Sequence, residues 1–284
     1  QAQARDARFV VRGDLWDFPY AEPGRGEFEV RAKLRDVVLD YVPPHLRGPN
    51  EPAWPALARV DADLHIDRVS LHIGAARGVV QAWPQLRTVQ TEARIPDFMA
   101  SDPVLQVRGQ VQGPGPDALA FVNAAPLGGL LGDVLREARL MGPVDLQLGL
   151  DLPLNQVDAV RVNGQLRLAG NDLQVSPESP WLRATTGVLE FSERGFRVPQ
   201  ASARLLGGEA RFSGGMERRA GQPVVRFQGQ GQVTAEGLQR ADDLPAGAAV
   251  LAALGRQTSG ATAYRARLEF GPDGQSLWVE SGLQ

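Results

Sequence analysis

The 284-residue chain is 43% hydrophobic, which is enough to bury a sizeable core and excludes a disordered chain. Its formal net charge of −3 comes from 30 basic and 33 acidic residues without a basic stripe, so we expect no nucleic-acid partner. It contains no cysteine, which excludes disulfides, thiolate metal sites and cysteine nucleophiles.

Short runs in which apolar and polar residues alternate predict β-strands along most of the chain. Residues 26–35 alternate in this way, and residues 60–67 and 69–73 do so on either side of Asp67-Arg68, which predicts a hairpin of two half-buried strands. Similar runs lie at residues 89–95, 105–111, 144–152, 160–168, 187–192, 196–200, 210–214, 225–233, 264–270 and 276–279. Turn-like GPG, ERG, LGGE and GPDG separate some of them, and a coarse count gives about fourteen antiparallel strands.

Two helices are expected to interrupt the strands. A helix begins near Pro116, and the apolar residues of its second part recur at helical spacing over residues 127–139. On sequence alone, this part could be a lid, a plug, an end-cover or core. A second helix, short and rich in alanine, is expected at residues 245–256. The segment HLRGPNEPAWP, residues 45–55, is expected to form a loop.

An internal repeat is visible at an offset of 125 residues. Residues 55–66 match residues 180–191 without gaps at Pro55, Leu57, Leu64 and Ile66, and residues 267–279 look like a third copy of the hairpin. Repetition of a β unit predicts an extended sheet that grows by addition. We expect one continuous structural unit with a first β-repeat segment at residues 1–113, a helical insertion at 114–141 and a second β-repeat segment at 142–284.

The sequence contains no signature of catalysis. The three histidines lack a recognisable nucleophile or base setting, and no hydrolase, metalloprotease, phosphate-binding or dinucleotide motif is present. The sequence shows no paired carboxylates of the kind that glycoside hydrolysis uses, so a β-helical carbohydrate-active enzyme is disfavoured. The best metal candidate is a set of polar residues on the predicted hairpin, but a solvated strand face explains them better, and no metal or other cofactor is expected. This set comprises Asp61, Asp63, His65, Asp67 and His72.

The apolar strand faces allow two architectures. They form either the core of a closed β-sandwich or, if a long sheet only curls, the lining of a trough. No apolar run reaches the roughly 20 residues that a membrane-spanning helix needs. Both ends of the sequence read as strand, so we expect a piece of a longer protein.

Taken together, several stretches resemble the YhdP family of AsmA-like proteins of the Gram-negative envelope, in its DUF3971-type region. They include FVVRGDLWDFPY, GRGEFEVRAKLRDVVLDY, WPALARVDADLHIDRVSLHI, ARIPDF, DALAFVNAAPLGGLLGD, GPVDLQLGLDLPL, GVLEFSERGFRV, LLGGEARFSG and SLWVESGLQ. The resemblance covers most of the chain, and none of these stretches is a catalytic signature.

The resemblance implies a mainly β fold, namely an extended, curled antiparallel sheet of repeated β units with an apolar interior and one or two short amphipathic helices. It implies a periplasmic protein, anchored in the inner membrane by a segment absent here, that conducts phospholipids between the inner and outer membranes and meets other envelope proteins. The alternative is a structural or interaction scaffold of the envelope with a closed core and no lipid.

In the family, the working surface is the lining of the groove. The matching positions here are Val60, Leu64, Ile66, Leu71, Ile73, Leu146, Leu148, Leu150, Leu166, Leu168, Leu189, Phe191, Phe196, Phe212, Phe227, Leu268 and Phe270.

Overall fold

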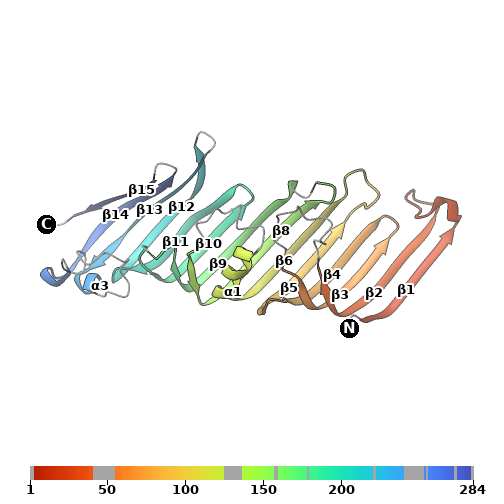
Figure 1. Cartoon of the computed structure of the whole chain (residues 1–284), viewed down its shortest axis with the longest axis horizontal. Coiled ribbons are helices and arrows are strands. Elements are labelled where there is room, and N and C mark those ends of the chain that lie inside the picture. The colour runs from red at the N-terminus through yellow and green to blue at the C-terminus, as the bar shows by residue number, and fades with distance from the viewer. Residues whose placement is uncertain are drawn as a thin grey trace. The chain divides into compact units, whose positions relative to one another are not determined.

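The fold is an antiparallel β-sheet (Figure 1). The computed structural model describes residues 3–40, 55–124, 136–156, 159–177, 179–219, 222–239, 253, 255–271 and 274–282. In these residues fifteen strands belong to one sheet with the order β1-β2-β3-β4-β5-β6-β8-β9-β10-β11-β12-β13-β14-β15, and β7 pairs with β9. The order is an open path, which confirms the expected mainly β, unclosed antiparallel sheet. No helix in the described part of the chain has the length and apolar character needed to span a membrane.

The strands are mostly 11 to 14 residues long, and the helices are short. In chain order the elements are β1 (Gln3–Gly13), η1 (Leu15–Asp17), β2 (Gly26–Leu39), β3 (Leu57–Asp67), β4 (Ser70–Val80), β5 (Trp83–Ile95), β6 (Val104–Pro114), α1 (Gly115–Ala124), β7 (Arg139–Met141), β8 (Pro143–Pro153), β9 (Arg161–Gln174), β10 (Leu182–Ser192), β11 (Gly195–Leu205), β12 (Gly208–Arg219), β13 (Gln222–Thr234), α3 (Ala235–Gln239), β14 (Ala261–Gly271) and β15 (Gly274–Ser281).

The chain divides into two compact units. Unit 1 comprises residues 1–113, 124–126 and 145–164, and unit 2 comprises residues 114–123, 127–144 and 165–284. Within unit 1, strands β1 to β6 follow one another in chain order (Figure 1). Within unit 2, strands β10 to β15 do the same. The predicted division at residues 113 and 141 stays a prediction.

The hairpin predicted from alternation is present as β3 and β4. Asp67 pairs with Ser70, and the turn residue Arg68 has a left-handed φ of 51°. The apolar residues of one strand face those of the other, as in the pair formed by Ile66 and Leu71. The alternation therefore predicted both the strands and their register, because a register shift of one residue would turn every apolar side chain to the polar face.

The strands of unit 1 are bent by β-bulges. The pairing of β2 with β3 and of β3 with β4 shifts in register at residues that have left-handed φ values of about 52°, namely Asp36 and Arg59. A third such residue, Ala75, lies at the register shift between β4 and β5. A bulge adds a residue to one strand only, which bends that strand and increases its twist. Successive bulges thus curve the sheet within unit 1.

A side chain of the neighbouring strand holds one of these bulges. The backbone N–H of Asp36 donates to Asp61 Oδ1 at 3.1 Å, and Arg35 Nη1 lies 3.2 Å from Asp61 Oδ2. The carboxylate therefore satisfies a backbone donor that the bulge has taken out of the regular ladder.

Unit 2 repeats this arrangement at another bulge. Ala184, with a φ of 48°, donates its backbone N–H to Asp172 Oδ1 at 2.9 Å, and Arg183 Nη1 donates to Asp172 Oδ2 at 3.0 Å. Burial raises the pKa of the Asp172 carboxyl, but the hydrogen bonds from Ala184 and Arg183 and the charge of Arg183 outweigh it, so this pKa lies below its ordinary value. We call Asp172 with these two partners the Asp172 clasp.

The internal repeat extends to whole strands. The bounds of β3 and β10 are 125 residues apart at both ends, and so are those of β4 and β11. The bulge residues Arg59 and Ala184 occupy equivalent positions at the same offset. A helix follows the fourth strand of each set, since α1 begins directly after β6 and α3 directly after β13. The same supersecondary pattern thus occurs twice along the chain.

One part of the helix predictions is confirmed and another part is wrong. The predicted start near Pro116 agrees with α1, but GPG at residues 113–115 joins a strand to a helix instead of two strands. Most of the predicted helix at 127–139 lies outside the described residues, and its end is wrong, because residues 136–138 are not helical and Arg139 begins β7. Leu140 is buried and pairs with Leu173, so strand pairing outweighs helical periodicity there.

Two other expectations fall mainly on residues that the structure does not describe. The predicted helix at 245–256 is described only at residues 253 and 255–256, which are helical. The expected loop at residues 45–55 lies outside the described residues except for Pro55.

Candidate functional site

The apolar face of the sheet in unit 1 consists of rows of side chains that run from strand to strand. One row runs from β1 to β5 through Phe9, Val30, Ile66, Leu71 and Ile95. The next row runs from β2 to β6 through Ala32, Leu64, Ile73, Ala93 and Val107. Residues paired across antiparallel strands place their side chains on the same face, so each row is a continuous apolar stripe.

These stripes are only partly covered. In the first row the four residues after Phe9 are half-buried, and Phe9 is 68% exposed. In the second row all residues except Ala32 are half-buried. A packed core leaves few large aliphatic side chains in this state, because burial of such a side chain contributes about 1.5–3 kcal/mol. The stripes therefore have apolar surface available for a further partner.

The same face is closed toward one end of β3 and β4. Val60, Ala62 and Ala76 are buried and form a cluster. Partly buried neighbours pack against this cluster, namely Leu34, Val37, Leu39, Leu57 and Ile73. One strand thus contributes both to a packed core and to the half-covered stripes, since Leu64 and Ile66 continue the line of Val60 and Ala62.

Strand β8 also has an apolar face. Leu146 and Leu150 are buried, and Leu148 between them is half-buried. Gln147 is exposed, as expected of the next residue on a strand, whose side chain points to the opposite face.

In unit 2 the apolar face carries a cluster of aromatic rings. The ring centroids of Phe196 and Phe227 are 6.2 Å apart, and those of Phe212 and Phe227 are 6.5 Å apart. Phe227 is paired with Gly214, and a Cβ atom added to this glycine would collide with the Phe227 ring and with a backbone oxygen. The glycine thus leaves the space that the ring occupies, and a large side chain there would displace it.

All residues predicted to line the groove lie on described strands. Val60, Leu146 and Leu150 are buried, and the others are half-buried. The structure pairs several of them across strands, including Leu64 with Ile73, Phe191 with Phe196 and Phe227 with Leu268. Their role as a groove lining stays a prediction.

Sequence reasoning missed several members of the same face. Ile95 and Val107 stand in the rows of unit 1, and Val225 is paired with Phe270 in unit 2. All three belong to runs whose alternation predicted strands. Extending the inward positions along each run would have found them.

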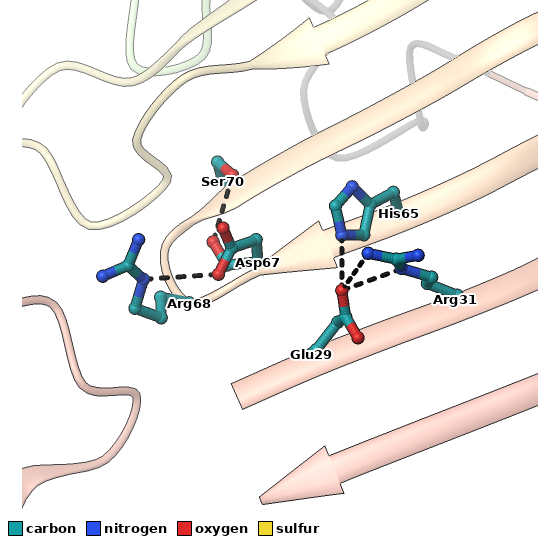
Figure 2. A network of polar contacts seen from close by, with 6 residues as sticks. All are labelled: Glu29, Arg31, His65, Asp67, Arg68 and Ser70. Carbon is teal, nitrogen blue, oxygen red and sulfur yellow. Dashed lines mark hydrogen bonds and ion pairs between the residues drawn. The ribbon is translucent and has the colours of Figure 1, made fainter. Parts of the chain in front are cut away.

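The opposite face of the β2–β4 region carries a network of charged and polar residues (Figure 2). Glu29 Oε1 contacts Arg31 Nη2 at 2.6 Å and His65 Nε2 at 3.1 Å. Burial raises the pKa of the Glu29 carboxyl, but these hydrogen bonds and the neighbouring charges outweigh it and hold this pKa below its ordinary value. Asp67 pairs with Arg68 at 3.3 Å. The network is built from hydrogen bonds and ion pairs within the face.

Several of these contacts involve residues of the metal candidate that the sequence offered. Asp61 and Asp67 pair with arginines, and His65 pairs with Glu29. Among the described residues no group of three or more His, Asp or Glu side chains is arranged to hold a metal ion.

Comparisons with known proteins complete the description. The family model described as YhdP protein matches residues 1–283. A curated relative, the intermembrane phospholipid transporter YhdP of Escherichia coli (strain K12), is 30% identical over 192 residues, which is 66% of this chain and 14% of the relative. The chain thus spans a small part of that relative's length. No solved structure matches the chain. Because the family model covers almost every residue, the chain belongs to the YhdP family.

Proposed function

We propose that this chain is a segment of a bridge-like lipid-transfer protein and that its apolar sheet face carries phospholipid acyl chains between two membranes. The observation that carries the proposal is the set of half-covered apolar rows in unit 1, continued in kind by the phenylalanine cluster of unit 2. A relative is named an intermembrane phospholipid transporter, which supports the same class of ligand.

The physical basis is the cost of exposing an acyl chain to water. Each methylene group exposed to water costs about 0.8 kcal/mol, so a sixteen-carbon chain would face roughly 13 kcal/mol without cover. A row of Leu, Ile and Val side chains that is continuous across strands removes much of this cost at every step. The lipid can therefore move from one row to the next without leaving apolar surroundings.

The proposal needs no chemical step by the protein. Conduction makes and breaks no covalent bond, and an apolar lining binds the acyl chains without contacting a headgroup. We therefore propose a passive, non-enzymatic role, with modest selectivity for the headgroup. The chain would work in the periplasm as part of a longer protein anchored in the inner membrane.

The experiment is to measure phospholipid that co-purifies with the 284-residue chain from a Gram-negative host, by native mass spectrometry and organic extraction. We expect bound phospholipid in the wild type. Leu148→Asp should lower it about tenfold, because the loss of one leucine contact of about 1.5 kcal/mol corresponds to that factor. Gln147→Asp is the matched control, since it adds the same charge one residue away on the opposite face.

A second pair of variants tests the rows of unit 1 directly. Ile73→Asp places the charge in the second row of unit 1, and His72→Asp places it on the opposite face. Thermal unfolding should stay cooperative in each variant used. A folded wild type that carries no lipid, or equal lipid in all four variants, would contradict the proposal and favour the alternative, a scaffold whose apolar face is closed on itself.

A further inference from the structure

A shallow hollow of about 600 Å³ lies over strands β11 to β15 in unit 2. Its polar lining includes Arg211, Gln228, Gln230, Arg265, Arg267 and Glu280, and Trp278 lies beside them. These residues alternate along their strands with the phenylalanine-bearing positions, so they belong to the polar face of the sheet. The hollow is therefore separate from the apolar face to which we assign lipid.

The three arginines of the hollow differ from other arginines of unit 2. Arg197 and Arg226 each contact a glutamate oxygen through two nitrogens, at distances between 2.6 and 3.1 Å. In contrast, Arg211, Arg265 and Arg267 have no carboxylate within 4.0 Å among the residues that the structure describes. The acidic residue of the lining, Glu280, is paired with Arg265 across the strands but makes no ion pair within 4.0 Å among the described residues, so the hollow holds three arginines against one glutamate.

The sheet brings these three cations close together. Arg265 and Arg267 are two residues apart on β14, which places their side chains on one face about 7 Å apart. Gln230 is paired with Arg211 on one side and with Arg265 on the other, and Gln228 is paired with Arg267. Because like charges at this spacing repel each other, an anionic partner would be stabilised there.

The neutral residues add contacts of other kinds. Gln228 and Gln230 can each donate and accept hydrogen bonds, as the backbone of a peptide requires. Trp278 is 52% exposed at the edge of the hollow, and its ring offers an apolar surface beside the Arg267 guanidinium, which lies 6.0 Å from the ring centroid. A second hollow shares Gln200 and Arg211 with the first and extends to the hydroxyl pair of Thr186 and Ser202, which are 2.8 Å apart. The binding surface is thus elongated across several strands.

We propose that this hollow docks an acidic peptide segment of a partner protein. Guanidinium groups form paired hydrogen bonds with carboxylates, the glutamines fit the peptide backbone, and Trp278 fits an apolar side chain. A concave surface suits a chain segment better than a flat bilayer. The inference does not rest on lipid transfer.

The test measures binding of a fluorescently labelled hexaglutamate peptide to the 284-residue chain at low ionic strength, with hexaglutamine as the neutral probe. We expect hexaglutamate alone to bind. The double variant Arg211→Gln/Arg265→Gln should weaken binding more than about tenfold, because it removes charge-assisted hydrogen bonds. The control is Arg194→Gln/Arg197→Gln, which removes the same charge from exposed, already paired arginines and should change binding less than about threefold.

Three outcomes would overturn the inference. Absence of hexaglutamate binding would remove the site. Equal weakening in the two double variants would show that the net charge of the chain, and not the hollow, determines hexaglutamate binding. Binding of inorganic phosphate or phosphatidylglycerol vesicles that is tighter than that of hexaglutamate, and that depends on Arg211 and Arg265, would replace the acidic peptide with a phosphate group.

Discussion

The Asp172 clasp offers a direct test of how the bent strands are held. Asp172→Ala removes the acceptor of the Ala184 backbone N–H and the partner of Arg183. A hydrogen bond to a charged group contributes about 1.5–3 kcal/mol, but this carboxylate is 35% exposed, so water and salt reduce the value. We therefore expect the local opening free energy at Ala184 to fall by about 1–2 kcal/mol.

Hydrogen exchange at the Ala184 amide is the assay, because this N–H is itself the donor in the clasp. The expected change is exchange about tenfold faster in Asp172→Ala, since that factor corresponds to about 1.4 kcal/mol. The variant Asp172→Asn keeps an acceptor oxygen and should show a smaller increase. As a control, Asp151→Ala breaks only the pair with the Arg108 side chain and should leave exchange at Ala184 unchanged.

The clasp also predicts a dependence on pH. The pKa of Asp172 is lower in the folded chain than its ordinary value of 3.8, so its carboxylate stabilises the fold above that pH. As the pH falls below this value and the carboxyl takes up a proton, the difference between wild type and Asp172→Asn should shrink. Unchanged exchange at Ala184 in Asp172→Ala, or a uniform increase over all of unit 2, would refute the assignment of a local clasp.

Three further variants test packing. Asn171→Ala should lower the free energy of unfolding by about 2–4 kcal/mol in urea titration, because Asn171 is 1% exposed and its amide donates to two backbone carbonyl oxygens, at 2.8 and 3.0 Å. Gly214→Val should cost at least about 1–3 kcal/mol in the same assay, since its side chain would collide with Phe227 and with backbone, and a neutral result would contradict the ring placement. Trp16→Ala should shift the melting temperature little, because Trp16 is 94% exposed, and a large loss would reveal a contact that the fold does not contain.

Much of the fold could be predicted from the alternation of residues alone. Residues 60–73 show why, because their period of two assigns every apolar side chain to one face and leaves one register for the hairpin. The repeat was visible for the same reason, since β3 and β10 keep the same pattern at a fixed offset. Where one face of a strand is apolar and the other charged, the local sequence is enough to predict the strand and its register.

The bulges could not be predicted in this way. Arg59 and Ala184 carry side chains for which a left-handed φ is unfavourable, so propensity argues against it at both positions. The bulge at Ala184 is held by Asp172, which is twelve residues away in the sequence and adjacent only after strand pairing. Tertiary contacts decide such positions, and a single sequence does not display them.

The candidate sites differ in the same way: one follows from local alternation and the other depends on tertiary contacts. The apolar rows follow from alternation and were largely anticipated, as Leu64 and Ile66 show. The arginine hollow was not anticipated, because Arg211 and Arg265 are more than fifty residues apart and meet only through the register of β12 to β14. Whether an arginine has an acidic partner is likewise a property of the folded sheet.

The strand order of unit 2 has a consequence for how the chain folds. From β11 to β15, each strand pairs with the one directly before it in the chain. In three of these four pairs two residues separate the strands, and closing so short a connection costs little conformational entropy and favours rapid formation, whereas β13 and β14 are separated by residues 235–260. A chain emerging from its N-terminal side can therefore complete each hairpin as soon as its second strand is free. Every hairpin then presents an edge on which the following strand is built.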